Sequence, residues 1–155
     1  MSKGASKRKR GWIEFKGLQF AEPFATRSEL IQAIHAFFEE RGLNLATRKT
    51  PLQVRFSRKR NPTIVEDGAI MPIAGLHRSE WNLTGETLFV TKEIIVYVRK
   101  HASREDLLTT LGHELDHGAW VLEGRTFDDQ EKYWNRPHEV RARQVGSEWG
   151  QRLSR

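Results

Sequence analysis

Apolar side chains recur at helical spacing soon after the N-terminal region. Thr26 and Glu29 form a T-x-x-E capping box, in which each side chain accepts a hydrogen bond from a backbone N–H at the start of a helix. Gly42 supplies a stop, because glycine readily takes the left-handed conformation that ends helices. The pattern predicts a helix that begins near Thr26 and buries one apolar face. That face comprises Leu30, Ile31, Ile34, Phe37 and Phe38.

The middle of the chain changes to the pattern of strands. Apolar and polar residues alternate over residues 52–56, which is the period of a half-buried strand. Thr87–Val90 and Ile94–Val98 are β-branched and aromatic and predict further strands, with a bend or bulge at residues 92–93. A loop-rich stretch up to His77 is predicted by Pro62, Gly68, Pro72 and Gly75.

A second helical pattern runs from Arg104 to Glu123 without proline. Ser103 and Asp106 form a variant capping box before it, and Gly124 ends it. Its apolar stripe consists of Leu108, Leu111, Leu115, Ala119 and Leu122. With a third helical pattern near the C-terminus, the order of helix, strands and two helices predicts the α+β class.

The second helix contains the sequence His113-Glu114-Leu115-Asp116-His117, an H-E-x-x-H motif. Positions four apart share one face of a helix, so both imidazoles can reach the same ion. His113 lies roughly 200° around the helix from Leu111, so the histidines face away from the apolar stripe. Glu114 lies beside them, placed to hold a water on the metal rather than the metal itself. The motif predicts a metal site with a general base.

Composition narrows what this site can contain. The 155 residues include no cysteine, which excludes disulfides, thiolate zinc sites and cysteine nucleophiles. Residues 11–155 fit one domain, and no apolar run approaches the roughly 18 residues of a membrane helix. Glu14 and Lys16 interrupt the stretch after the basic N-terminus, which argues against a secretory signal. We expect a cytoplasmic, single-domain protein without membrane contact whose metal ligands are histidines and carboxylates.

A catalytic zinc site needs a third protein ligand and an open position. Asn135-Arg136-Pro137 is typical of a helix start, with the asparagine as cap and the proline in the first turn. Glu139 heads an inward-facing stripe of this helix, whereas His138 points about 100° away. We expect Glu139 as the third ligand and keep His138 as the alternative. The stripe continues through Ala142, Gly146, Trp149 and Leu153, and its small residues allow another helix to approach closely.

The spacing of these residues resembles that of the zincin metallopeptidases of the gluzincin type. His113-Glu114-x-x-His117 is followed by Tyr133-x-x-x-Pro137-x-Glu139-x-x-Ala142, a pattern similar to small bacterial and phage HExxH proteins and to ImmA/IrrE-like peptidases. SprT-like proteases, whose third ligand is a histidine, match less well. The resemblance covers about residues 87–150.

The resemblance implies a compact zincin-like fold and a peptidase activity. It implies a small, twisted, mostly antiparallel sheet in which Ile94–Val98 is the edge strand that receives the substrate. An N-terminal helix, the HExxH helix and a C-terminal helix bearing the third ligand complete this fold. The implied cofactor is Zn²⁺, held by His113, His117 and Glu139, with Glu114 activating the zinc-bound water that hydrolyses a peptide bond in a protein or peptide substrate.

The candidates to stabilise the oxyanion are Tyr133, ahead by analogy, His138 and Arg141. Trp120 falls on the histidine face and either lines the pocket or packs in the core. Arg143 stands one turn after Glu139, where many gluzincins carry an aspartate that supports a zinc histidine. Asp116, Asp128 and Asp129 are the remaining candidates for that carboxylate.

The net charge of +6 lies in two short clusters. Residues 1–10 hold five basic residues and no acid, and residues 48–60 hold six and no acid. Residues 11–155 hold 21 basic and 20 acidic residues, so the tail of residues 1–10 supplies most of the net charge. These clusters favour an alternative hypothesis, non-specific contact with nucleic-acid phosphates by a module whose zincin site is structural or inactive. A protein-interaction module that keeps the scaffold without turnover is a further alternative.

Overall fold

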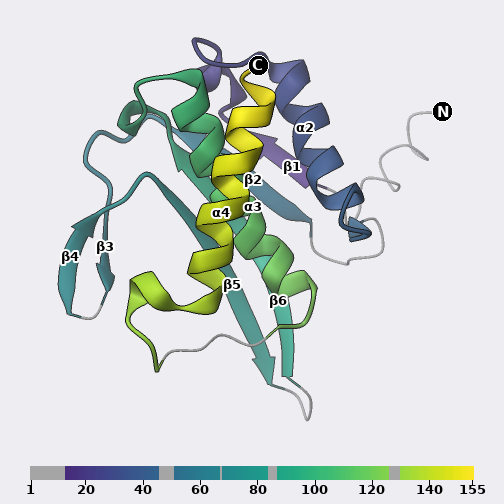
Figure 1. The fold of residues 1–155 in the computed structure, drawn as a ribbon, viewed down its shortest axis with the longest axis vertical. Helices are drawn as coiled ribbons and strands as arrows, with labels where there is room; N and C mark the ends of the chain where they lie inside the picture. Colours follow the sequence, from purple (N-terminus) through teal and green to yellow (C-terminus); the bar gives the residue numbers. More distant parts are fainter. Residues whose placement is uncertain (1–12, 46–50, 67, 84–86, 126–129) are drawn as a thin grey trace.

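The computed structural model describes residues 13–45, 51–66, 68–83, 87–125 and 130–155. These residues form a four-stranded sheet, a separate two-stranded sheet and three helices (Figure 1). The α+β class is therefore confirmed. The helices lie together on one side of the larger sheet, as Figure 1 shows.

The larger sheet is mixed, which corrects the expectation of a mostly antiparallel one. Its strands are ordered β1 (Ile13–Lys16), β2 (Leu52–Ser57), β6 (Thr87–Tyr97) and β5 (Gly75–Leu83). β1 pairs with β2 and β2 with β6 in parallel, whereas β5 pairs with β6 antiparallel. The parallel pairs arise because a helix follows β1 and further strands follow β2, so the chain can return to the same end of the sheet.

Strand β6 joins the two segments that the sequence separates, Thr87–Val90 and Ile94–Val98. Arg78 of β5 pairs with Glu93 and Ser79 pairs with Thr91, so residue 92 is an extra residue in β6. The predicted bulge is thus confirmed. The predicted edge position is wrong, because β6 pairs on both sides and the outer strands are β1 and β5.

The stretch predicted as loop-rich contains strands instead. β3 (Thr63–Glu66) and β4 (Ala69–Pro72) form an antiparallel hairpin, and β5 begins at Gly75. Gly68, next to the turn, has a φ of 78°, a left-handed conformation that suits glycine. The prolines lie where strand pairing tolerates them: Pro62 precedes β3, and Pro72 ends β4.

The first helix, α2 (Arg27–Glu39), starts as the sequence predicts. Thr26 accepts a hydrogen bond from the Glu29 backbone N–H, and the Glu29 carboxylate accepts one from the Thr26 N–H, which completes the capping box. The carboxylate of Glu29 also accepts hydrogen bonds at 2.6 and 2.8 Å from the Arg104 guanidinium. Arg104 is the first residue of the next helix, so this pair joins the starts of α2 and α3.

Helix α3 (Arg104–Leu122) carries the HExxH motif and is buried on nearly all sides. Ser103 caps it by accepting a hydrogen bond from the Asp106 N–H. Gly124, with a φ of 75°, follows its end, so both predicted boundaries are confirmed. One face packs on β5 and β6, and the other packs on α4 (Pro137–Leu153), as Figure 1 shows.

Helix α4 begins one residue later than predicted. Arg136 is the residue before the helix, without a side-chain cap, and Asn135 belongs to a short 3-10 turn (Tyr133–Asn135). The predicted asparagine cap is therefore wrong, because the helix starts at Pro137 and the cap position falls on Arg136. Pro137 does occupy the first turn.

Small residues set the distance between α3 and α4. A Cβ on Gly146 would lie 2.6 Å from the Thr109 carbonyl oxygen and 2.9 Å from the His113 nitrogen. Gly112 and Gly150 are similarly crowded across the same contact. The close approach predicted for the stripe of α4 is confirmed, and it brings the start of α4 against the motif.

Candidate metal centre

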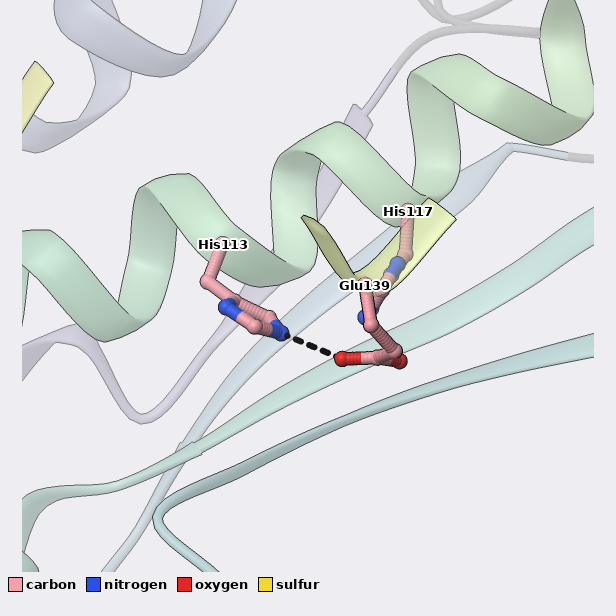
Figure 2. Close-up of side chains that lie close together, drawn as sticks. All are labelled: His113, His117 and Glu139. Carbon is pink, nitrogen blue, oxygen red and sulfur yellow. Dashed lines mark hydrogen bonds and ion pairs between the residues drawn. The ribbon is translucent and has the colours of Figure 1, made fainter. Parts of the chain in front are cut away.

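Three side chains from two helices converge at the contact between α3 and α4. His113 and His117 project from successive turns of α3, and Glu139 reaches them from the first turn of α4 (Figure 2). The Glu139 carboxylate lies 3.1 Å from His113 Nε2 through one oxygen and 2.9 Å from His117 Nε2 through the other. All three ligand atoms lie within 4.8 Å of one another, and the group could hold a metal ion.

The separations suit a tetrahedral ion. Two ligands about 2.0–2.1 Å from a tetrahedral zinc lie roughly 3.3 Å apart, close to the nitrogen–oxygen distances in the site. Two imidazoles and a carboxylate are also a known set of ligands for catalytic zinc. The identity of the metal is not fixed by these distances, because other divalent ions accept the same donors.

Hydrogen bonds within the triad outweigh the effect of burial on its charges. Burial favours a raised pKa for Glu139, but hydrogen bonds from His113 and His117 outweigh it and hold that pKa well below its ordinary value. Burial favours a lowered pKa for His117, but the hydrogen bond to Glu139 and the nearby carboxylates outweigh it and raise that pKa. The site therefore attracts positive charge, which a proton or a metal cation can supply.

Glu114 lies beside the triad and binds neither histidine. It is 7% exposed, and burial raises the pKa of its carboxyl. Its neighbour across the contact with β5 is Gly75, where a Cβ would meet Glu114 Cγ at 2.9 Å and Oε2 at 3.1 Å. Glycine at this position gives the carboxylate its space.

One pocket of about 130 Å³ contains the proposed base and two of the triad. Glu114, His117 and Glu139 line it, together with Tyr133. The structure thus brings Tyr133 to the site, as the sequence predicts. Its catalytic role stays a prediction.

The other residues considered for ligand and donor roles are outside the ligand group and the pocket lining. His138 is buried beside the triad, with Nε2 3.6 Å from Glu139 Oε2, but it is not part of the ligand group. Arg141 donates hydrogen bonds to Asp116 and Glu123, so its guanidinium is engaged away from the pocket. Trp120 packs near His138 and the Arg141 guanidinium and does not line the pocket.

No carboxylate supports the ligand histidines among the described residues. Asp116 is bound by Arg141, and His117 Nδ1 has no hydrogen-bond partner within the described part of the chain. Arg143 donates a hydrogen bond to the Trp134 carbonyl. Asp128 and Asp129 lie outside the described residues.

His77 is a pocket residue that the sequence does not reveal. Its ring centroid lies 6.4 Å from that of His117, and its Nε2 is buried without a hydrogen-bond partner among the residues described. Burial and the nearby His117 lower the pKa of His77 to about 3, so its imidazole is neutral. Gly75 and His77 face α3 together because they are two apart on strand β5. A prediction of strand β5 from the sequence would have placed Gly75 and His77 on the same face.

The basic clusters add little to this picture. Residues 1–10 and 48–50 lie outside the described residues, so nucleic-acid contact stays a prediction. Arg58, Lys59 and Arg60 are exposed after β2, whereas Arg55 pairs with Glu93 at 3.4 Å. In the described ranges, no helix has the length and apolar character needed to cross a membrane.

Comparison with known proteins gives no family for the chain. No family model matches it, and neither does a curated protein or a solved structure. The geometry of the site is therefore the basis for a functional assignment.

Proposed function

We propose that the protein is a zinc-dependent metallopeptidase. The observation that carries the proposal is the convergence of His113, His117 and Glu139, with Glu114 in the same pocket. A purely structural site would need the three ligands but no additional buried carboxylate. Burying the carboxyl of Glu114 there costs folding free energy. Residues that are kept in spite of such a cost are typical of catalytic sites.

In the proposed hydrolysis the triad binds the metal and Glu114 transfers the proton. A zinc ion held by His113, His117 and Glu139 would supply Lewis-acid polarisation of the scissile carbonyl and acidify a water. Glu114 accepts a proton from the attacking water, whose oxygen bonds to the carbonyl carbon. Glu114 then passes that proton to the amine as the carbon–nitrogen bond breaks, which leaves a carboxyl and an amino end. The raised pKa of Glu114 suits both steps, because it lies nearer to working pH.

Two neutral donors are available for the carbonyl oxygen as it gains charge. Tyr133 lines the pocket and offers a phenolic O–H. His77 lines it from the opposite element, strand β5, and offers a neutral imidazole. We assign Tyr133 the role of donor, in agreement with the resemblance, and place His77 beside it.

The direct test removes the base without touching a ligand. Glu114→Gln should keep stoichiometric zinc by elemental analysis and lose about 10²–10⁴-fold in hydrolysis of a quenched-peptide library. Glu105→Gln is the matched control, an exposed glutamate on the same helix that should change neither reading. Unchanged hydrolysis by Glu114→Gln would refute the proposed mechanism. Zinc-loaded wild-type protein that cleaves no peptide would favour a protein-interaction role.

A further inference from the structure

The pocket beside the triad has two chemically different walls. The polar wall carries two of the proposed metal ligands, His117 and Glu139, and the residues proposed for proton transfer and carbonyl binding. The other wall is apolar, and it is formed by Ile64, Met71, Ile73 and Leu76. Ile64 and Met71 come from the β3–β4 hairpin, which is a separate sheet (Figure 1).

The register of the hairpin sorts its side chains between two faces. Ile64 pairs with Met71, and both are half-buried and line the pocket. Val65 pairs with Ile70, and these side chains are 66% and 74% exposed. Since successive residues of a strand point to opposite faces, Ile64 and Met71 face the metal side and their neighbours face away.

The charges in the pocket exclude charged occupants. No lysine or arginine lines the pocket within the described ranges, so an acidic side chain would find no basic side chain to pair with and would face the carboxylate of Glu114. A basic side chain would lose water against the apolar wall, and Glu139 is already engaged by two histidines. An uncharged apolar side chain matches this wall without an unpaired polar group.

We propose that Ile64 and Met71 select substrates with an apolar side chain next to the peptide bond that is cut. This inference rests on the proposed peptidase function and adds a specificity-determining element to it. The hairpin buries the apolar side chain while the polar wall binds the scissile carbonyl. The pocket volume of about 130 Å³ is in the range of a single apolar side chain.

The test measures binding of N-acetyl amino-acid hydroxamates to zinc-loaded wild-type protein by calorimetry. Affinity should rise from glycine to leucine and phenylalanine hydroxamate by roughly tenfold or more, because each added methylene is worth about tenfold in a fitted apolar pocket. Aspartate and lysine hydroxamates should bind no better than the glycine compound. A flat series overturns the proposal, whatever the variants show.

Matched variants locate the effect on one face of the hairpin. Met71→Gln should remove most of the leucine-over-glycine preference, and Ile70→Gln, its exposed neighbour, should keep it. Ile64→Thr and Val65→Thr form a second pair of the same kind. Equal loss of preference in both members of a pair overturns the proposal.

Failure of the proposed function gives a different result from failure of this inference. Protein that retains zinc and binds acetohydroxamate, but shows no side-chain preference, contradicts only the role of the hairpin. Protein that binds no zinc at the triad contradicts the proposed function, and the selection of substrates falls with it.

Discussion

Two buried carboxylates join helices α3 and α4, and they differ in what neutralises them. Asp116 is 0% exposed and lies 3.0 Å from Nε of Arg141. Glu139 is 4% exposed and is bound by the imidazoles of His113 and His117. An arginine stays charged at every pH of interest, whereas an imidazole loses its charge near pH 6.5.

The comparison separates a permanent ion pair from a cluster that could hold a metal ion. Asp116 directly precedes His117, and Arg141 follows Glu139 by two residues, so the two clusters are neighbours on the same helices. Position along the helix therefore does not distinguish them. Arg141 supplies a permanent positive charge to Asp116, whereas the histidine cluster gains positive charge only with added protons or a metal ion.

Removing Glu139 should abolish the metal site and leave the ion pair of Asp116 and Arg141 intact. Glu139→Ala should weaken zinc binding by more than about 100-fold, because loss of an outer-shell partner already costs 10–100-fold and this residue is a proposed direct ligand. The folded structure should persist, because the substitution removes a buried charge and does not leave one unpaired. Zinc titration followed by calorimetry measures the affinity, and circular dichroism checks the fold. Unchanged zinc affinity would contradict the assignment and direct attention to His138.

Removing Arg141 should lower the stability of the fold and leave zinc binding intact. Arg141→Met leaves Asp116 as an uncompensated buried charge and should lower the free energy of unfolding by about 3 kcal/mol, the low end of the range because Arg141 is partly exposed. Urea denaturation of metal-free protein measures this change. Zinc binding by the folded variant should be nearly unaffected. If the variant lost zinc but not stability, the two clusters would not be independent.

Gly75 sharpens the comparison, because only the histidine cluster has a second carboxylate packed against strand β5. Gly75→Ala would place a methyl 2.8 Å from Thr110 Cγ2 and 2.9 Å from Glu114 Cγ, so Glu114 must shift. Hydrolysis should fall by up to about 100-fold, as expected for a misplaced catalytic group. Zinc content should stay at the wild-type level, since no ligand is touched. Full activity in this variant would show that the position of Glu114 is not critical.

The two clusters should also respond differently to pH. The pKa of His117 is raised above 6.5, so a proton competes with zinc until the pH exceeds that raised value. Zinc affinity should therefore rise with pH above 6.5, by up to about tenfold per unit, and then level off. Zinc titrations between pH 6 and 9 measure it.

Metal-free protein should show the reverse trend from the same group. A His117 pKa raised in the folded state stabilises the fold below the unfolded value of 6.5, and this contribution is lost as the pH rises through the folded pKa. Burial opposes a raised pKa for Arg141, but the bonds to Asp116 and Glu123 outweigh it, so that cluster should contribute equally across this range. Denaturation midpoints with a chelator present measure the trend. The expected result is that zinc affinity rises with pH while the stability of metal-free protein falls. An increase of both quantities with pH would contradict the role assigned to His117.

The sequence predicts the triad because each part of it depends on local helical spacing. The four-residue step between His113 and His117 fixes their common face, and the inward stripe headed by Glu139 places its carboxylate against them. Capping residues such as Thr26 and Ser103 are equally local, and they are confirmed as helix starts.

The sequence does not predict what strand pairing brings to the site. His77 and Gly75 meet the motif only because β5 is an outer strand and runs antiparallel to β6, which depends on contacts distant in the sequence. The prolines and glycines of residues 62–75 are typical of loops, so the sequence pattern does not indicate the β3–β4 hairpin. The Asn135 cap fails because Asn135 belongs to a 3-10 turn and the helix starts at Pro137, which puts Arg136 at the cap position.

The most direct measurement of the central claim is a crystal structure of the zinc-loaded protein with anomalous data at the zinc edge. The expected result is one strong peak bonded to His113 Nε2, His117 Nε2 and the Glu139 carboxylate, with Glu114 nearby but not bonded to the metal. A protein crystallised with zinc that shows no peak there, or a peak bonded to His138 in place of Glu139, would contradict the claim.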